Sequence, residues 1–316
     1  MNTLFTADWH LKVGQKNVPE AWACERYSMF FQKIHELEKG IDLHVIGGDL
    51  FDRIPTMTEL ELYFEFICGV GVRTLIYDGN HEATKKHQTF LTQLKKASKE
   101  VNPLIEVVDS IYNEDHFGVL PYCALHGKWH AKDFNIRKPL FTHVRGAIPP
   151  HVTPEVDLKR FQQFPIIFAG DLHSHTNTQL NIVYPGSPMT TQFHRNLVET
   201  GYIIISENNW EWHKFDLPQL IRKTVSSPEE MVPTDYHHTI YELEGDIADL
   251  SSVANSDLLD KKVIKRKTET ALMLDKEMSL EEELVEYLSY ILELEENKVK
   301  DVLSTFHDYS KEIAVG

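Results

Sequence analysis

Five short segments of the chain have side chains able to bind metals at the point where an apolar, strand-like stretch gives way to a loop. They are Asp8-Trp9-His10, Gly47-Gly48-Asp49, Gly79-Asn80-His81-Glu82, His143 and Gly170-Asp171-Leu172-His173-Ser174-His175. Together they supply carboxylate and amide oxygens, several imidazoles and a spare histidine, which is what a site for two divalent cations needs. Each motif alone is common, so it is the ordered set that predicts the site.

Short apolar stretches alternate with stretches whose apolar residues recur at helical spacing. Helices are expected over residues 20–39, 58–68 and 89–100. Strands are expected at residues 43–46, 74–77, 105–108, 117–121, 140–143, 166–169, 182–184, 202–206 and 210–215. This alternation, with glycines at several strand ends, predicts an α/β fold.

A polar stretch interrupted by prolines follows Leu217-Pro218 and predicts a domain boundary. Residues 1–217 would form the main domain and residues 218–276 a small α/β capping domain, with strands at 239–243 and 263–264 and a helix at 247–255. Residues 277–316 would form a helical tail. Ser279 is a suitable N-cap for it, because acidic residues follow in the first turn.

The composition limits the class of protein. The formal net charge is −16, whereas free-standing DNA-binding proteins are more often basic. A nucleic-acid substrate would therefore be held locally, through metal ions or by a basic partner.

Three widely spaced cysteines, Cys24, Cys68 and Cys123, fit a reducing compartment. The N-terminus lacks the pattern of a signal peptide. No apolar run approaches the length of about 20 residues that spans a bilayer. These features predict a cytoplasmic protein without a membrane partner.

Each motif has a chemical rationale. Side chains two apart on a strand point the same way, so Asp8 and His10 can share a cation. Asp49 follows Gly48, where the missing side chain gives a metal or phosphate access to the backbone, and its carboxylate could bridge two cations. Asn80 offers a neutral oxygen ligand, and the adjacent His81 suits a general acid.

The ordered motifs resemble those of the calcineurin-like metallophosphoesterase superfamily, whose pattern is DxH, GD, GNH, H and GHxH. Within it, residues 47–52 with Pro55, residues 142–147 and residues 184–188 look like SbcD-type DNA exonuclease subunits, including the small recombination-exonuclease subunits of large tailed phages. The resemblance covers residues 1 to about 217 well. It implies a four-layer α-β-β-α sandwich with two central mixed sheets.

The resemblance also implies the ligands of two divalent cations, most naturally Mn²⁺, with Mg²⁺ as the other candidate. One cation would be held by Asp8, His10, Asp49 and His173, and the second by Asp49, Asn80, His143 and Asp171. His81 would sit over the leaving group as the catalytic acid.

One departure from the pattern concerns the last motif, where Asp171 stands in place of the first histidine of GHxH. Either Asp171 replaces that histidine and His173 is the second, or His173-Ser174-His175 supplies both. The first alignment is favoured because Gly170 directly ends the strand. His175 would then lie on the substrate side or behind the ligands.

The expected mechanism is in-line attack of an activated water on phosphorus, with His81 protonating the departing oxygen. Asp52 and Glu82 are candidates to orient the histidine. Carboxylates in such positions are more often surface or capping residues.

Two further features concern partners. The basic run at residues 261–267 could contact DNA phosphates or could be an ordinary solvated segment. Apolar residues of the tail recur at helical spacing and predict two amphipathic helices with a break near residues 295–297. These helices could pack on their own domain, whereas the resemblance implies docking to the coiled coil of an SbcC-like ATPase. It also implies a homodimer, formed through the helices at 58–68 and 89–100, within a heterotetramer.

The motifs together with the resemblance therefore predict a metal-dependent DNA exonuclease or endonuclease subunit. The resemblance implies that it works with an SbcC-like ATPase in recombination, repair or DNA degradation. One alternative is a phosphomonoesterase or cyclic-nucleotide phosphodiesterase of the same superfamily. Another is a subunit that cleaves weakly and clamps the ATPase to DNA, which the substitution at Asp171 would explain.

Overall fold

The computed structural model describes residues 1–85, 88–207, 209–232, 234, 236–245, 259–263, 279–292 and 294–313. The chain separates into two compact units, one of Met1–Leu243 with Asn255–Asp260 and one of Glu244–Ala254 with Lys261–Gly316. The division predicted at residues 217 and 276, with the roles given to its three parts, stays a prediction. The expected helix at 247–255 and the basic residues at 264–267 lie outside the described residues.

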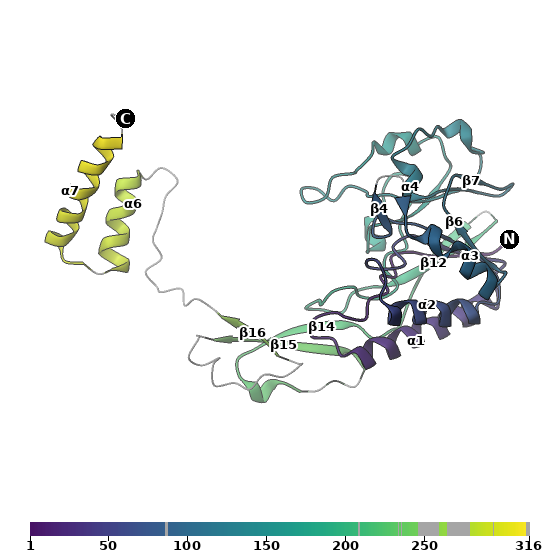
Figure 1. Ribbon diagram of the computed structural model, residues 1–316, viewed down its shortest axis with the longest axis horizontal. Coiled ribbons are helices and arrows are strands. Elements are labelled where there is room, and N and C mark those ends of the chain that lie inside the picture. Colours follow the sequence, from purple (N-terminus) through teal and green to yellow (C-terminus); the bar gives the residue numbers. More distant parts are fainter. Residues whose placement is uncertain are drawn as a thin grey trace. The chain divides into compact units, whose positions relative to one another are not determined.

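Two β-sheets form the body of the first unit (Figure 1). The larger has the order β13 (Asn209–Lys214), β12 (Gly201–Ser206), β1 (Thr3–Thr6), β2 (Leu43–Gly47), β3 (Arg73–Tyr77) and β6 (Ile105–Val108). The smaller has the order β11 (Ile182–Val183), β10 (Ile167–Gly170), β9 (Leu140–His143), β8 (Gly118–Leu120) and β7 (Tyr112–Asn113). Strands β1, β2, β3 and β6 are parallel, and so are β8 to β11, whereas β12 and β7 run antiparallel to their neighbours.

The alternation of side chains along the strands divides the apolar residues into three cores. On β1, Leu4 packs in the core on the helical side and Phe5 in the core between the sheets. On β9, Leu140 belongs to the core on the outer side of the smaller sheet. Phe141 faces inward, with its ring centroid 5.3 Å from that of Phe5. Two stacked sheets with both outer faces covered confirm the predicted sandwich.

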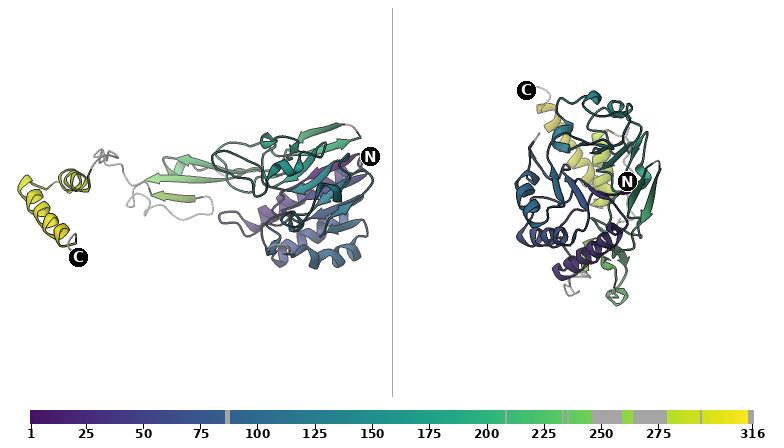
Figure 2. Two further views of the ribbon diagram at one scale, coloured as in Figure 1. Left: turned by 90° about the horizontal axis from the view of Figure 1, so that it is seen from above. Right: turned by 90° about the vertical axis from the view of Figure 1, so that its right-hand side faces the viewer.

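Three helices cover the larger sheet, as Figure 1 and Figure 2 show: α1 (Glu20–Glu38), α2 (Met57–Gly69) and α3 (Leu91–Val101). They match the three helices predicted from periodicity, with ends within two residues. α2 begins at a capping box in which the Thr56 hydroxyl and the Glu59 carboxylate each accept a backbone N–H of the other residue.

The fourth layer is built from shorter pieces. It comprises α4 (Tyr122–Leu125) and the 3₁₀ turns at Ala131–Asp133 and Leu158–Phe161. The stretch between β8 and β10 is rich in turn residues and lacks a long apolar periodicity, which explains why no long helix forms there. Further 3₁₀ turns occur at His175–Asn177 and Pro228–Glu230.

Two small sheets complete the strands. β14 (Leu220–Val225), β15 (His238–Gly245) and β16 (Leu259–Val263) form a three-stranded sheet in which β14 and β15 are parallel. β4 (Ala83–Lys85) and β5 (Gln88–Thr89) form an antiparallel pair. The strand predicted at 239–243 is confirmed within β15.

The second unit contains helices α6 (Leu280–Glu286) and α7 (Glu296–Ile313), with a π-helical turn at Tyr287–Ile291. Ser279 caps α6 as predicted, because its hydroxyl accepts the Glu282 N–H and the Glu282 carboxylate accepts the Ser279 N–H. The predicted break near residues 295–297 falls at the start of α7. In the described part of the chain, no helix combines the length and apolarity that crossing a membrane requires.

Candidate metal centre

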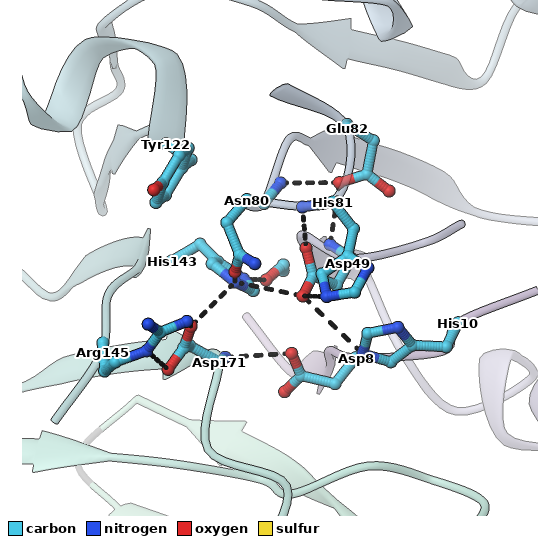
Figure 3. A network of polar contacts seen from close by, with 12 residues as sticks. Asp8, His10, Asp49, Asn80, His81, Glu82, Tyr122, His143, Arg145 and Asp171 are labelled. Atoms are coloured by element: carbon cyan, nitrogen blue, oxygen red, sulfur yellow. Dashed lines mark hydrogen bonds and ion pairs between the residues drawn. The ribbon is translucent and has the colours of Figure 1, made fainter. Parts of the chain in front are cut away.

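The five segments singled out in the sequence meet at the carboxyl ends of β1, β2, β3, β9 and β10 (Figure 3). Backbone hydrogen bonds join the loops after β1 and β2, with the Asp8 N–H donating to Gly48 O at 3.0 Å. The Asp171 N–H donates to the Asp8 Oδ1 atom at 2.9 Å and so links the two sheets. Parallel strands in both sheets thus bring distant parts of the sequence to one edge.

Several residues of the centre have left-handed backbone conformations. The φ angle is 57° at Asp8, 47° at His10, 50° at Asp49 and 100° at Asp171. Such conformations cost about 1–3 kcal/mol each for residues other than glycine, and they concentrate at functional sites. The surrounding structure therefore holds these side chains in place against a local preference.

Two glycines are required by the packing of the centre. Gly48 has a φ of 84°, and a Cβ atom there would overlap the His143 ring. A Cβ atom on Gly79 would overlap the Asp49 carboxylate. Any larger residue at either position would displace a candidate ligand.

We call Asp8, His10 and His173 the histidine-rich half of the centre. The Nε2 atoms of His10 and His173 lie 3.1 Å apart, so at most one of them carries a proton toward the other. His173 Nδ1 lies 3.3 Å from the Thr191 hydroxyl. The Asp8 Oδ2 atom is buried and has no hydrogen-bond partner within the described residues.

We call Asn80, His143 and Asp171 the arginine-paired half. Arg145 donates from Nε and Nη2 to the two oxygens of Asp171, at 3.1 Å and 3.0 Å. His143 Nε2 lies 3.0 Å from Asn80 Oδ1, and His143 Nδ1 lies 3.0 Å from the Gly47 carbonyl. Both ring nitrogens of His143 therefore face acceptors (Figure 3).

Asp49 lies between the two halves. Its Oδ2 atom is 3.7 Å from His10 Nε2, 3.5 Å from His143 Nε2 and 3.9 Å from His81 Nε2. Its Oδ1 atom accepts the His81 N–H at 2.9 Å. A carboxylate in this position can bridge cations held on either side.

The His81 side chain reaches the surface, with a relative exposure of 36%. Its Nδ1 atom lies 2.6 Å from the carbonyl oxygen of Asp52. This carbonyl can accept only from a protonated Nδ1, so it fixes the ring with Nε2 on the side of Asp49.

Glu82 is fully buried and connects the loops after β2 and β3 through hydrogen bonds. Its carboxylate accepts the backbone N–H groups of Asp49, Phe51 and Gly79 at 3.0, 2.8 and 2.7 Å. Burial, reinforced by the charge of Asp49, raises the pKa of Glu82 to about 8. Glu82 therefore orients Asp49 through its backbone rather than orienting the His81 ring.

Asp52 contacts both histidines, but in different ways. Its carboxylate lies 3.5 Å from His10 Nδ1 and 2.7 Å from Lys12 Nζ, whereas its backbone carbonyl meets His81. His10 and Lys12 outweigh the effect of burial and hold the pKa of Asp52 well below its usual range. Asp52 thus stays ionised beside the histidine-rich half.

His175 is held behind the ligands. Its Nδ1 atom lies 2.7 Å from the Tyr184 carbonyl, and its ring stacks on Trp212 with centroids 5.2 Å apart. Asp171, by contrast, points into the centre. This placement supports the alignment in which Asp171 and His173 are the functional pair.

Sequence reasoning missed three residues around the centre. Arg145 pairs with Asp171, the Ser187 hydroxyl donates to the Asp8 carbonyl, and Thr191 contacts His173. Arg145 could have been found, because a buried carboxylate that replaces a histidine needs a new partner of positive charge. Ser187 and Thr191 come from a loop whose approach the sequence does not indicate.

The ionisable groups of the centre change one another's pKa values. Burial raises the pKa of Asp8 to about 8. Burial disfavours protonated His143, but Asp49, Asp8 and Asp171 outweigh it and raise the pKa of His143 to about 9. Burial, reinforced by His10, lowers the pKa of His173 to about 4. His173 is therefore a neutral imidazole near pH 7, the form that binds metal ions.

The donor set fits divalent cations. Three groups each bring ligand atoms within 4.8 Å of one another, namely Asp8 with His10 and His173, His10 with Asp49 and His81, and Asp8 with Asp49 and His143. A buried carboxylate oxygen without a partner, such as Asp8 Oδ2, is costly, and a cation would satisfy it. Carboxylate, amide and imidazole ligands together suit a divalent cation.

Comparison with known proteins agrees with this geometry. The sequence profile of calcineurin-like phosphoesterases matches residues 1–163. A protein of Escherichia phage T5, named as a probable exonuclease subunit 1, is 37% identical to this chain. The alignment covers 99% of both chains. Two proteins named as phosphoesterases, 078R of Invertebrate iridescent virus 3 and 244L of Invertebrate iridescent virus 6, are 26% and 27% identical. The alignment with 078R covers 69% of this chain and 66% of that protein. The alignment with 244L covers 72% of this chain and 82% of that protein.

Proposed function

This chain belongs to the calcineurin-like phosphoesterase family, and on that premise we propose that it is the nuclease subunit of a DNA exonuclease or endonuclease complex. It hydrolyses phosphodiester bonds with two divalent cations, Mn²⁺ by preference and Mg²⁺ as the alternative. It works with an SbcC-like coiled-coil ATPase in recombination, repair or DNA degradation, in the cytoplasm of the cell that hosts the DNA.

One observation carries the proposal more than any other. Asp49 has His10 on one side and His143 on the other, within 3.7 Å and 3.5 Å of the same oxygen. This arrangement is what a bridging ligand requires, and it supports two cation positions rather than one.

The proposed ligands follow from the two halves. Asp8, His10, Asp49 and His173 would hold one cation, and Asp49, Asn80, His143 and Asp171 would hold the other. When bound, the cations would neutralise the charge of the phosphodiester and acidify the attacking water. Glu82 keeps Asp49 in register, and Gly48 and Gly79 leave room for the His143 and Asp49 side chains.

His81 is proposed to protonate the departing oxygen. Its Nδ1 proton is held by the Asp52 carbonyl, so Nε2 is free to exchange a proton with the substrate. Its partial exposure suits contact with a large substrate such as DNA, in contrast to the buried His143.

The first test compares bis-p-nitrophenyl phosphate with p-nitrophenyl phosphate in the presence of Mn²⁺. The proposal expects faster hydrolysis of the diester, and a strong preference for the monoester would favour a phosphomonoesterase. His81→Asn is expected to lower the turnover number roughly 10²- to 10⁴-fold. It should leave the number of bound Mn²⁺ ions unchanged, which separates its role from that of a ligand.

The second test uses linear DNA with the ATPase partner, ATP and Mn²⁺. Degradation that His81→Asn abolishes would support the nuclease. Intact DNA under these conditions, with a stable complex, would instead favour a subunit that clamps the ATPase to DNA.

Docking of the partner is proposed for the helical tail. The phage T5 relative is named a subunit, which supports a partner protein. Leu292 and Val302 are 48% and 39% exposed, whereas Leu288 and Val299 are buried. Val302→Asp should weaken co-purification with the ATPase, whereas the matched change Val232→Asp, at a 61% exposed position outside the tail, should not.

A homodimer is proposed through helices α2 and α3. Ile54 and Met57 lie just before and at the start of α2 and are 67% and 73% exposed. If they form the contact, Met57→Lys will convert a dimer into a monomer in light-scattering measurements. An unchanged mass would reject this surface.

A further inference from the structure

Arg145 and Asp171 form a two-pronged ion pair at the edge of the centre. The guanidinium donates from Nε and Nη2 to both oxygens of a carboxylate that is 4% exposed. The same carboxylate lies 3.9 Å from His143 Nε2. The Asp171 carboxylate therefore lies between Arg145 and His143, a candidate cation ligand (Figure 3).

Arg145 is also held from its backbone. Its N–H donates to Glu155 Oε1 at 3.2 Å. The other oxygen of Glu155 accepts the Tyr122 hydroxyl at 2.9 Å and lies 3.3 Å from His126 Nε2. With both main chain and side chain fixed, the guanidinium would lose little conformational freedom on binding a ligand.

Part of the guanidinium remains open. The Arg145 side chain is 42% exposed, and its Nη1 atom has no hydrogen-bond partner in the part of the chain that the structure describes. Lys12, on the opposite side of the centre, is instead bound to Asp52 at 2.7 Å. Arg145 is thus a cationic side chain near His143 that can still donate outward.

A phosphodiester needs such a group here. The centre brings together the carboxylates of Asp8, Asp49 and Asp171 in a protein with a net charge of −16. Bound cations would offset this charge, and the planar guanidinium adds a fixed positive group that matches the geometry of phosphate oxygens.

We propose that Arg145 binds a non-bridging oxygen of the substrate phosphate and that Asp171 is the positioning residue that holds its guanidinium. This inference rests on the proposed phosphodiesterase activity. It gives the aspartate that replaces the expected histidine a role in placing a fixed positive charge.

The test uses the full-length protein with Mn²⁺ and bis-p-nitrophenyl phosphate. Arg145→Gln is expected to raise KM roughly 10- to 100-fold, as expected for the loss of a charged hydrogen bond, with a smaller change in kcat. The inhibition constant of inorganic phosphate should rise by a similar factor. Arg145→Lys should restore part of the affinity, because it keeps the charge but not the fork.

The number of bound Mn²⁺ ions separates this role from a purely structural one. Arg145→Gln should bind as many ions as the unaltered protein, and loss of an ion would overturn the proposal in favour of a role in holding the cation site. Arg195→Gln is the matched control, because Arg195 also pairs with a carboxylate, that of Glu242 at 3.0 Å, but on the three-stranded sheet. It should leave KM unchanged.

Unchanged KM and phosphate inhibition in Arg145→Gln, with an active unaltered protein, would also overturn the proposal. If the unaltered protein fails to hydrolyse the diester, the proposed function fails instead. Calorimetric binding of inorganic phosphate in the presence of Mn²⁺ then still decides the inference, since weaker binding by Arg145→Gln supports it and equal binding rejects it.

Discussion

The two halves of the metal centre differ in how far the protein itself satisfies them. In the histidine-rich half, Asp8 Oδ2 is buried without a partner within the described residues, and two imidazole nitrogens face each other at 3.1 Å. In the arginine-paired half, Asp171 is bound through both oxygens and both nitrogens of His143 face acceptors.

The two halves should therefore respond differently to a cation. A cation in the histidine-rich half would relieve an unpaired carboxylate oxygen. One in the arginine-paired half must displace existing hydrogen bonds, such as that between His143 and Asn80. We therefore expect the first cation to bind more tightly than the second.

The largest effect is expected from Asp49→Asn, because Asp49 belongs to both halves. Loss of its negative charge should lower the affinity of both halves for a cation. Hydrolysis of the diester should fall by about 10³-fold or more. Metal analysis of the dialysed variant checks the prediction, and retention of two tightly bound ions would show that Asp49 does not bridge.

Two variants, each of which changes one half of the centre, test whether the halves bind cations separately. His10→Gln should lower the affinity for the tighter cation by at least about 10- to 100-fold, and Asn80→Ala should affect only the weaker one. Calorimetric titration with Mn²⁺ distinguishes the two steps. Equal effects on both steps from either variant would mean that the halves do not act separately.

Proton release is the next test. Without a cation, Asp8 and His143 have pKa values of about 8 and about 9, so both are largely protonated at pH 7. Each must lose its proton to bind a cation. Affinity should therefore rise with pH by up to about tenfold per proton and pH unit, and level off above about pH 9.

The measurement is calorimetry in two buffers with different heats of ionisation. His143→Gln should reduce the number of protons released, whereas His173→Gln should not, because the pKa of His173 is already lowered to about 4. Binding without proton release at pH 7 would contradict the prediction.

The smallest effect is expected from Glu82→Gln, which changes the support of Asp49 without touching either half directly. At neutral pH the raised pKa of Glu82 leaves its carboxyl group largely protonated, so the neutral amide of glutamine should lower the unfolding free energy by no more than about 1 kcal/mol. Denaturant titration in EDTA checks it. Glu61→Gln, at an exposed position on α2, should leave stability unchanged.

Much of this architecture could be predicted from the sequence. The apolar strands that end in Gly47 and Gly170 fixed the register of the ligands that follow, and the helical spacing from Trp22 to Leu37 indicated α1. Local patterns suffice here because strand ends and helix faces depend on neighbouring residues.

What the sequence did not predict depends on long-range contacts. Glu82 follows His81 directly, yet it turns inward to the backbone of Asp49 and Phe51 rather than toward the His81 ring. Arg145 meets Asp171 across two strands of the smaller sheet. No periodicity encodes such pairings, because they arise from how loops of different strands pack together.

The left-handed backbone at Asp8, His10, Asp49 and Asp171 has a consequence for how this protein can change. Glycine adopts these conformations without a steric cost. Replacement of one of these residues by glycine would therefore relieve the backbone but remove a candidate ligand. At these positions selection for activity acts against selection for stability. A survey of stabilising substitutions should therefore find large gains at positions where the substitution removes a candidate metal ligand.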